Sequence, residues 1–100
     1  MNILITSAGR RVSLTRAFKK ELHEFFPDGK LLTADMNPVL APACHCSDGY
    51  FSVPAATDPS YIRELIGLCR KENVKLIIPT IDTELFVLAE NIDILRDNGI

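Results

Sequence analysis

The stretch NILITSAG, residues 2–9, decides the fold. Its first part is apolar or β-branched and carries no charge, which is typical of a strand buried on both faces. Such strands occur mainly in parallel sheets, where helices cover both sides. The glycine at the end of the stretch predicts a sharp turn, because glycine adopts backbone conformations that other residues avoid. The stretch therefore predicts the first strand of an α/β protein.

The rest of the chain continues this alternation. Apolar residues recur at helical spacing between Leu14 and Phe25, between Ile62 and Cys69, and from Leu85 onward, and each run predicts one helix. The predicted strands are residues 2–6, 30–35, 50–53 and 74–78. Residues 36–49 are irregular, and Pro42 limits any helix there to about one turn.

This order predicts one Rossmann-like α/β domain over residues 1–100. Right-handed connections give a three-layer architecture, a parallel sheet of order 3-2-1-4 with helices on both faces. Gly99 and Ile100 lie where a fifth strand would begin, so we expect the fold to be truncated at its C-terminal end, with the downstream region absent.

The composition excludes several classes of protein. With 11 Lys and Arg against 13 Asp and Glu, the net charge is −2, whereas a nucleic-acid binder usually carries a basic excess. No apolar run approaches the ~18 residues of a membrane span, and no signal peptide is recognisable. We therefore expect a cytoplasmic protein whose three cysteines are free thiols.

The architecture predicts where a ligand binds. In open parallel sheets, ligands bind outside the carboxyl ends of the strands, at the point where strand order reverses. Here that point lies between the first and fourth strands. The loops that line it are residues 7–11 and 79–84, and Asp35 flanks them at the end of the second strand.

The first loop favours an anion. Gly9 allows a ligand to approach the backbone, and the helix that follows offers free N–H groups at its positive end. Arg10 and Arg11 add two cations there, although helix N-termini normally favour acids. We therefore predict that Gly9, Arg10 and Arg11 bind the negative group of a substrate.

The second loop has two interpretations. Thr80 or Asp82 can cap the last helix, and Glu84 can complement the helix dipole. Alternatively, Thr80, Asp82 and Glu84 bind a substrate, with a carboxylate accepting hydrogen bonds from its amine. Cations on one loop and carboxylates on the other suit a zwitterion such as an amino acid.

Two other kinds of site match the sequence less well. A dinucleotide fingerprint needs glycine at position 7 and glycine or alanine at position 12, and only Gly9 fits, although Asp35 stands where a ribose-binding acid belongs. The Cys-His-Cys run at residues 44–46 has no second pair of ligands, so we expect no metal there. No catalytic residue is predicted.

Four motifs together resemble a known family. These are ITSAGRR (5–11), AD (34–35), DGYFSVP (48–54) and IPTIDTEL (78–85). In this order they resemble the N-terminal, pre-ATP-grasp domain of ATP-grasp enzymes, nearest the group similar to the carbamoyl-phosphate synthase large subunit. The resemblance covers essentially the whole chain.

The resemblance implies a ligase that activates a carboxylate with ATP as an acyl phosphate and joins it to an amine. ATP and Mg²⁺ would bind in a downstream ATP-grasp domain, so no cofactor is expected in these residues. By the same resemblance, Gly9, Arg10, Asp35, Asp82 and Glu84 border the substrate.

Two rival functions stay open at this stage. The chain could be a Rossmann module that binds NAD(P) or another nucleotide, or a structural domain without a ligand. The expected partners are a small, amino-acid-like substrate and the downstream domain. A homodimer is also possible, because a short sheet with exposed edge strands favours pairing.

Overall fold

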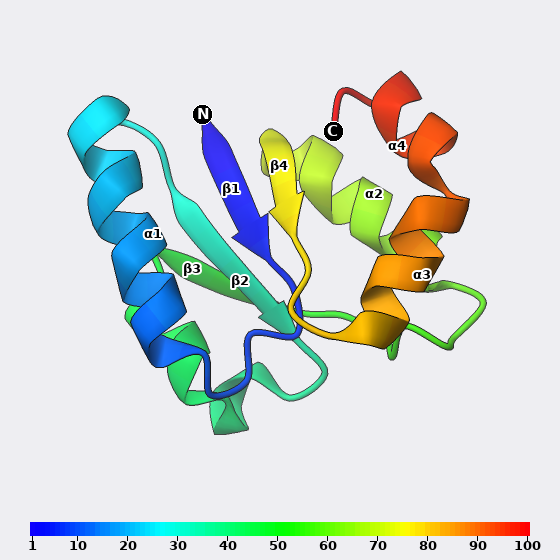
Figure 1. The fold of residues 1–100 in the computed structure, drawn as a ribbon, viewed down its shortest axis with the longest axis horizontal. Helices are drawn as coiled ribbons and strands as arrows, with labels where there is room; N and C mark the ends of the chain where they lie inside the picture. Colours follow the sequence, from blue (N-terminus) through cyan, green and yellow to red (C-terminus); the bar gives the residue numbers. More distant parts are fainter.

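The computed structural model describes residues 1–100 and shows a four-stranded parallel sheet between helices (Figure 1). The strands are β1 (Asn2–Ile5), β2 (Leu31–Asp35), β3 (Gly49–Ser52) and β4 (Val74–Ile78). They lie in the order β3-β2-β1-β4, which confirms the predicted order and the Rossmann-like fold class. β3 and β4 are the two edges, and β1 is one of the two central strands.

Helices flank both sides of this sheet (Figure 1). The helices are α1 (Val12–Phe25), α2 (Tyr61–Lys71), α3 (Asp82–Glu90) and α4 (Ile92–Asp97). α1 packs on one face together with two short 3-10 helices, η1 (Pro38–Leu40) and η2 (Pro42–Cys46), and α2 to α4 pack on the other. No helix is long and apolar enough to cross a membrane.

The side chains of β1 alternate between two hydrophobic cores, one on each face of the sheet. Leu4 and Ile5 are both fully buried, yet they point to opposite faces because successive side chains of a strand alternate. Leu4 joins the cluster that contains Leu65 of α2, and Ile5 joins the cluster that contains Leu22 of α1. The continuous apolar run in the sequence therefore serves both faces at once.

Two predicted helices differ in detail from the structure. The apolar stripe of α1 is only partly buried: Leu22 is 5% exposed, but Leu14 is 36% and Phe25 is 73% exposed. The last predicted helix is divided at Asn91, whose side chain donates a hydrogen bond to the Val87 carbonyl. Asparagine competes in this way with the helical hydrogen bonds, which explains the break.

The irregular segment forms η1 and η2 instead of a single turn. Each begins with proline, which fits the first turn of a helix because its missing N–H would have no partner there. The Ala43 amide donates to the Gly9 carbonyl at 3.0 Å. This bond ties the segment to the loop after β1, which belongs to the candidate site.

Gly67 gives a test of the fold. It lies inside α2, and a Cβ atom added there would meet nothing within 4 Å. We expect Gly67→Ala to raise the free energy of unfolding by about 0.8–1 kcal/mol, since alanine is the better helix former. Gly29→Ala is the contrasting control, because its Cβ would overlap the Met1 carbonyl oxygen. Urea denaturation of both variants checks this, and a destabilised Gly67→Ala would contradict the structure of α2.

Candidate functional site

A small cavity lies at the carboxyl ends of the strands, where the sequence predicts the site. Its volume is about 210 Å³. The loop after β1 contributes Ser7, and the loop and helix start after β4 contribute Ile81 and Thr83. Met36 and residues 53–57, which follow β2 and β3, complete the lining. The two predicted loops therefore meet at one cavity, although none of the seven residues predicted to bind the substrate lines it.

Glu84 is linked to this cavity through Ser7, one of the lining residues, and it connects the surrounding elements. Its side chain is 1% exposed, and each oxygen accepts two hydrogen bonds. The donors are Thr6 Oγ1 (2.9 Å) and the Thr80 amide (3.4 Å) on Oε1, and Ser7 Oγ (2.7 Å) and Tyr61 Oη (2.9 Å) on Oε2. Because protein groups occupy both oxygens, Glu84 acts on the site through the loops that it holds.

Tyr61 is a site-building residue that the sequence patterns did not indicate. It is the first residue of α2 and is 1% exposed. Burial, and then the neighbouring Glu84 carboxylate, raise the pKa of Tyr61 far above its usual value, so the hydroxyl stays protonated and donates. Tyr61 lies four residues before Leu65, and therefore on the same apolar face of the helix. Because the hydroxyl of a buried tyrosine needs a hydrogen-bond partner, this spacing was the signal in the sequence that could have indicated a buried polar contact.

The loop after β1 has a strained backbone that its contacts hold in place. Ser7 has φ +48° and Gly9 has φ +47°, and the left-handed region is uncommon for a residue with a side chain. Ser7 is held through Glu84 and through Thr80, whose Oγ1 donates to the Ser7 carbonyl at 2.8 Å. Strain of this kind persists where surrounding contacts fix the conformation, and it is common in binding loops.

Asp35 stabilises the same loop from the other side. Its Oδ2 accepts a hydrogen bond from the Gly9 amide at 3.0 Å, and its Oδ1 accepts one from the Asn37 amide. The Ala8 amide donates to the Ala34 carbonyl. A dinucleotide or ATP phosphate would need such loop amides free, and a carboxylate already lies on one of them. A phosphate would therefore have to compete with Asp35 for the Gly9 amide.

The two arginines differ in their contacts. Arg11 is the N-cap residue of α1, and its guanidinium donates to the Thr80 carbonyl at 3.3 Å. Arg10 is exposed, and its side chain makes no hydrogen bond or ion pair within the chain. Arg11 thus joins the two loops, and Arg10 is free to meet a ligand.

The capping interpretation of the second loop is wrong. Ile81 is the N-cap of α3, and no side chain caps it. Thr80 Oγ1 instead donates to the Thr6 and Ser7 carbonyls, at 2.9 and 2.8 Å, because it lies next to β1. Asp82 is the first residue of α3 and is exposed, with no hydrogen bond from its side chain.

The predicted site residues therefore fall into two groups. Five of them take part in the hydrogen bonds that hold the loops: Gly9, Arg11, Asp35, Thr80 and Glu84. Arg10 and Asp82 stand exposed on these loops without a protein partner. One cation and one carboxylate are thus available to a ligand.

Comparison with protein families decides the class. A family model described as PylC-like, N-terminal domain, matches residues 3–100. The chain belongs to this family. It is a pre-ATP-grasp domain of ATP-grasp ligases, which confirms the resemblance to pre-ATP-grasp domains. No curated protein matches the chain in sequence.

The cysteine-rich segment of this PylC-like domain, residues 44–46, belongs to η2, which contacts the loop after β1 through the Ala43–Gly9 hydrogen bond. Cys44 is buried in the core on the α1 face, and burial raises the pKa of its thiol. All three cysteines are unpaired. Nowhere do three or more His, Cys, Asp or Glu side chains gather as they would around a metal ion.

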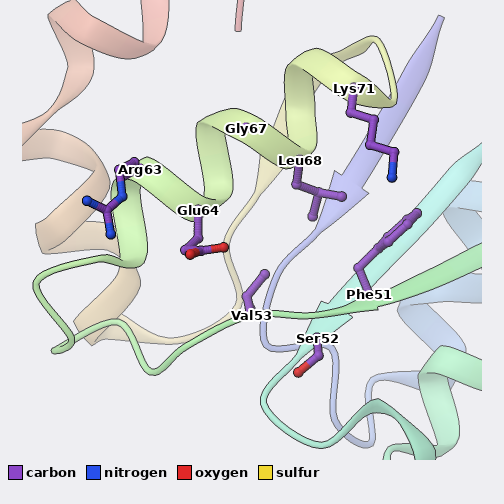
Figure 2. Close-up of a pocket in the computed structure, with 8 residues that line it drawn as sticks. All are labelled: Phe51, Ser52, Val53, Arg63, Glu64, Gly67, Leu68 and Lys71. Carbon is purple, nitrogen blue, oxygen red and sulfur yellow. The ribbon is translucent and has the colours of Figure 1, made fainter.

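A second groove of the PylC-like domain lies beside the candidate site. It has a volume of about 370 Å³ and runs between β3 and α2 (Figure 2). Val53 is the one residue that lines both this groove and the candidate site. Like the candidate cavity, the groove is lined by none of the residues predicted to bind the substrate.

The hydrogen bonds to Glu84 predict how the loss of a single hydroxyl group changes stability. Tyr61→Phe removes one donor from a buried carboxylate, and we expect the free energy of unfolding to fall by about 1.5–3 kcal/mol. Tyr50→Phe is the matched control, because Tyr50 is 44% exposed and its hydroxyl makes no hydrogen bond. Its expected change is within about 0.5 kcal/mol. Chemical denaturation measures both, and equal losses would contradict the assigned role of Tyr61.

Proposed function

We propose that this domain forms one wall of the substrate site of an ATP-grasp ligase and binds an amino-acid-like substrate. The observation that carries the proposal is the contact between the two loops. Arg11 and Thr80 hold the cationic loop after β1 against the acidic loop after β4, at the end of the sheet where ligands of this fold class bind.

The loop after β1 is suited to the carboxylate of such a substrate. Arg10 offers a guanidinium group, which matches a carboxylate by donating two parallel hydrogen bonds. The Arg10 amide also has no acceptor in the chain, so it can donate to the same ligand. Arg11 adds positive charge while it holds Thr80.

The loop after β4 is suited to the amine. Asp82 is exposed and free to accept hydrogen bonds from an ammonium group. Glu84 and Asp35 have a different part in this proposal, because protein amides and hydroxyls occupy their oxygens. They fix the loops that present Arg10 and Asp82.

ATP and Mg²⁺ bind outside these residues in our proposal, in a downstream ATP-grasp domain. ATP supplies the phosphoryl group that activates a carboxylate. At the loop after β1, its phosphates would have to compete with Asp35 for the Gly9 amide. The same contact counts against NAD(P). We propose a carboxylate–amine ligase of the group similar to carbamoyl-phosphate synthase, with no ATP hydrolysis by this chain alone.

A cytoplasmic location completes the proposal. It is supported by three unpaired cysteines, two of them buried, which suit a reducing compartment. Burial raises the pKa of Cys69 to about 11, so that thiol stays protonated and unreactive at neutral pH.

Amide NMR spectra of the chain, recorded with each of the twenty common amino acids, test the substrate wall. We expect at least one amino acid to shift the Gly9–Arg11 and Thr80–Thr83 signals, at millimolar concentration because only one wall is present. Its N-acetyl and methyl-ester derivatives, which each lack one charge, should shift them less. ATP and NAD⁺ should leave these signals unchanged.

Two variants test whether the exposed charges of Arg10 and Asp82 cause the changes in the amide signals. Arg10→Ala and Asp82→Asn should each abolish the response to the amino acid. Arg70→Ala, which removes an exposed arginine on α2, should leave it unchanged. The proposal fails if NAD⁺ shifts the same signals, or if the response survives both loop variants.

A further inference from the structure

β3 is an unprotected edge of the sheet. It pairs only with β2, so its outer side carries unpaired backbone groups. Natural edge strands are commonly protected by charged side chains, lysine above all. The other edge, β4, has an exposed Lys75, whereas β3 has the uncharged sequence Gly-Tyr-Phe-Ser at 49–52. β3 is therefore the edge that is open to strand pairing.

The helix beside this edge carries two charges that lack partners. Arg63, Glu64 and Lys71 of α2 all line the groove, and in Figure 2 the Glu64 and Lys71 side chains extend toward β3 while the Arg63 guanidinium extends in another direction. Neither Glu64 nor Lys71 forms an ion pair within the chain. Seven residues separate them, or about 10.5 Å along the helix, so they do not reach each other.

The spacing of these charges is self-complementary. A two-fold axis perpendicular to the sheet reverses the direction of α2, and it matches Glu64 with the partner's Lys71 and Lys71 with the partner's Glu64. The same operation sets β3 antiparallel to a second β3, which is the arrangement that unpaired edge strands form. One two-fold axis would thus serve both the strands and the charges, as an interface between identical subunits requires.

The end of β3 and the two charges of α2 lie on one surface. In the groove, Lys71 extends toward Phe51, and Glu64 lies near Val53 (Figure 2). Both charged side chains therefore line the same groove as Phe51 and Ser52 of β3.

We propose that β3 and α2 form the contact surface of a two-fold dimer, in which two sheets join through antiparallel β3 strands and Glu64 pairs with the partner's Lys71 on each side. Phe51 and Leu68 supply the apolar floor between the two helices. Val53 lines both this groove and the candidate site, so the dimer also steadies residues 53–57, one wall of that site.

Sedimentation velocity of the chain at increasing concentration tests the dimer. We expect reversible dimers that weaken with added salt, because exposed charges are screened. Glu64→Lys and Lys71→Glu each place like charges opposite one another at both contacts, and each should raise the dimer dissociation constant about tenfold. The double exchange, Glu64→Lys with Lys71→Glu, should restore the original dissociation constant.

The restoration separates the dimer contact from helix stability. Each single change opposes the helix dipole of α2, and the double exchange opposes it more than either. If these residues only stabilised α2, the double variant would therefore be the least stable and would not recover the dimer. Hydrogen exchange adds a second readout: the amides of β3 should be protected more at high concentration, and those of β4 should not. A chain that stays monomeric, a dimer insensitive to the single changes, or a double variant without recovery would each overturn the proposal.

Discussion

The site depends on one interaction, the buried carboxylate of Glu84 with its four donors. A carboxylate removed from water is strongly destabilising unless hydrogen bonds compensate the loss of hydration. Here Thr6, Ser7, Tyr61 and the Thr80 amide provide them, and they come from the end of β1, the loop after it, the start of α2 and the loop after β4. Elements that are far apart along the chain must therefore come together around one side chain.

The geometry of the loops follows from this carboxylate. It holds Ser7 in a left-handed conformation, and Thr80 fixes the same turn through two carbonyl oxygens. Asp35 completes the arrangement by accepting a hydrogen bond from the Gly9 amide. With the backbone fixed in this way, Arg10 and Asp82 remain as the exposed charges. Of the three acids on these elements, Glu84 and Asp35 hold the loops through hydrogen bonds, and Asp82 is exposed without a protein partner.

The sequence predicted the strands and their order because these depend on local patterns: a buried parallel strand is continuously apolar, and right-handed connections restrict the topology. It predicted less well which helical residues are buried. Phe25 belongs to a regular apolar stripe, yet it is the last residue of α1 and is 73% exposed. The role of Glu84 depends on partners 78 and 23 residues away, Thr6 and Tyr61, and no local pattern indicates such contacts.

Hydrogen exchange of individual amides in Glu84→Gln tests the central claim most directly. Glutamine keeps the shape of the side chain but replaces one acceptor oxygen with an NH₂ donor, which cannot accept the hydroxyl hydrogens. The account predicts faster exchange at the Ala8 and Gly9 amides, which lie in the loop after β1, and at Thr80, with β2 amides such as Leu32 unchanged relative to global stability. Unchanged exchange in the loops, or a uniform loss of protection through the whole sheet, would contradict it.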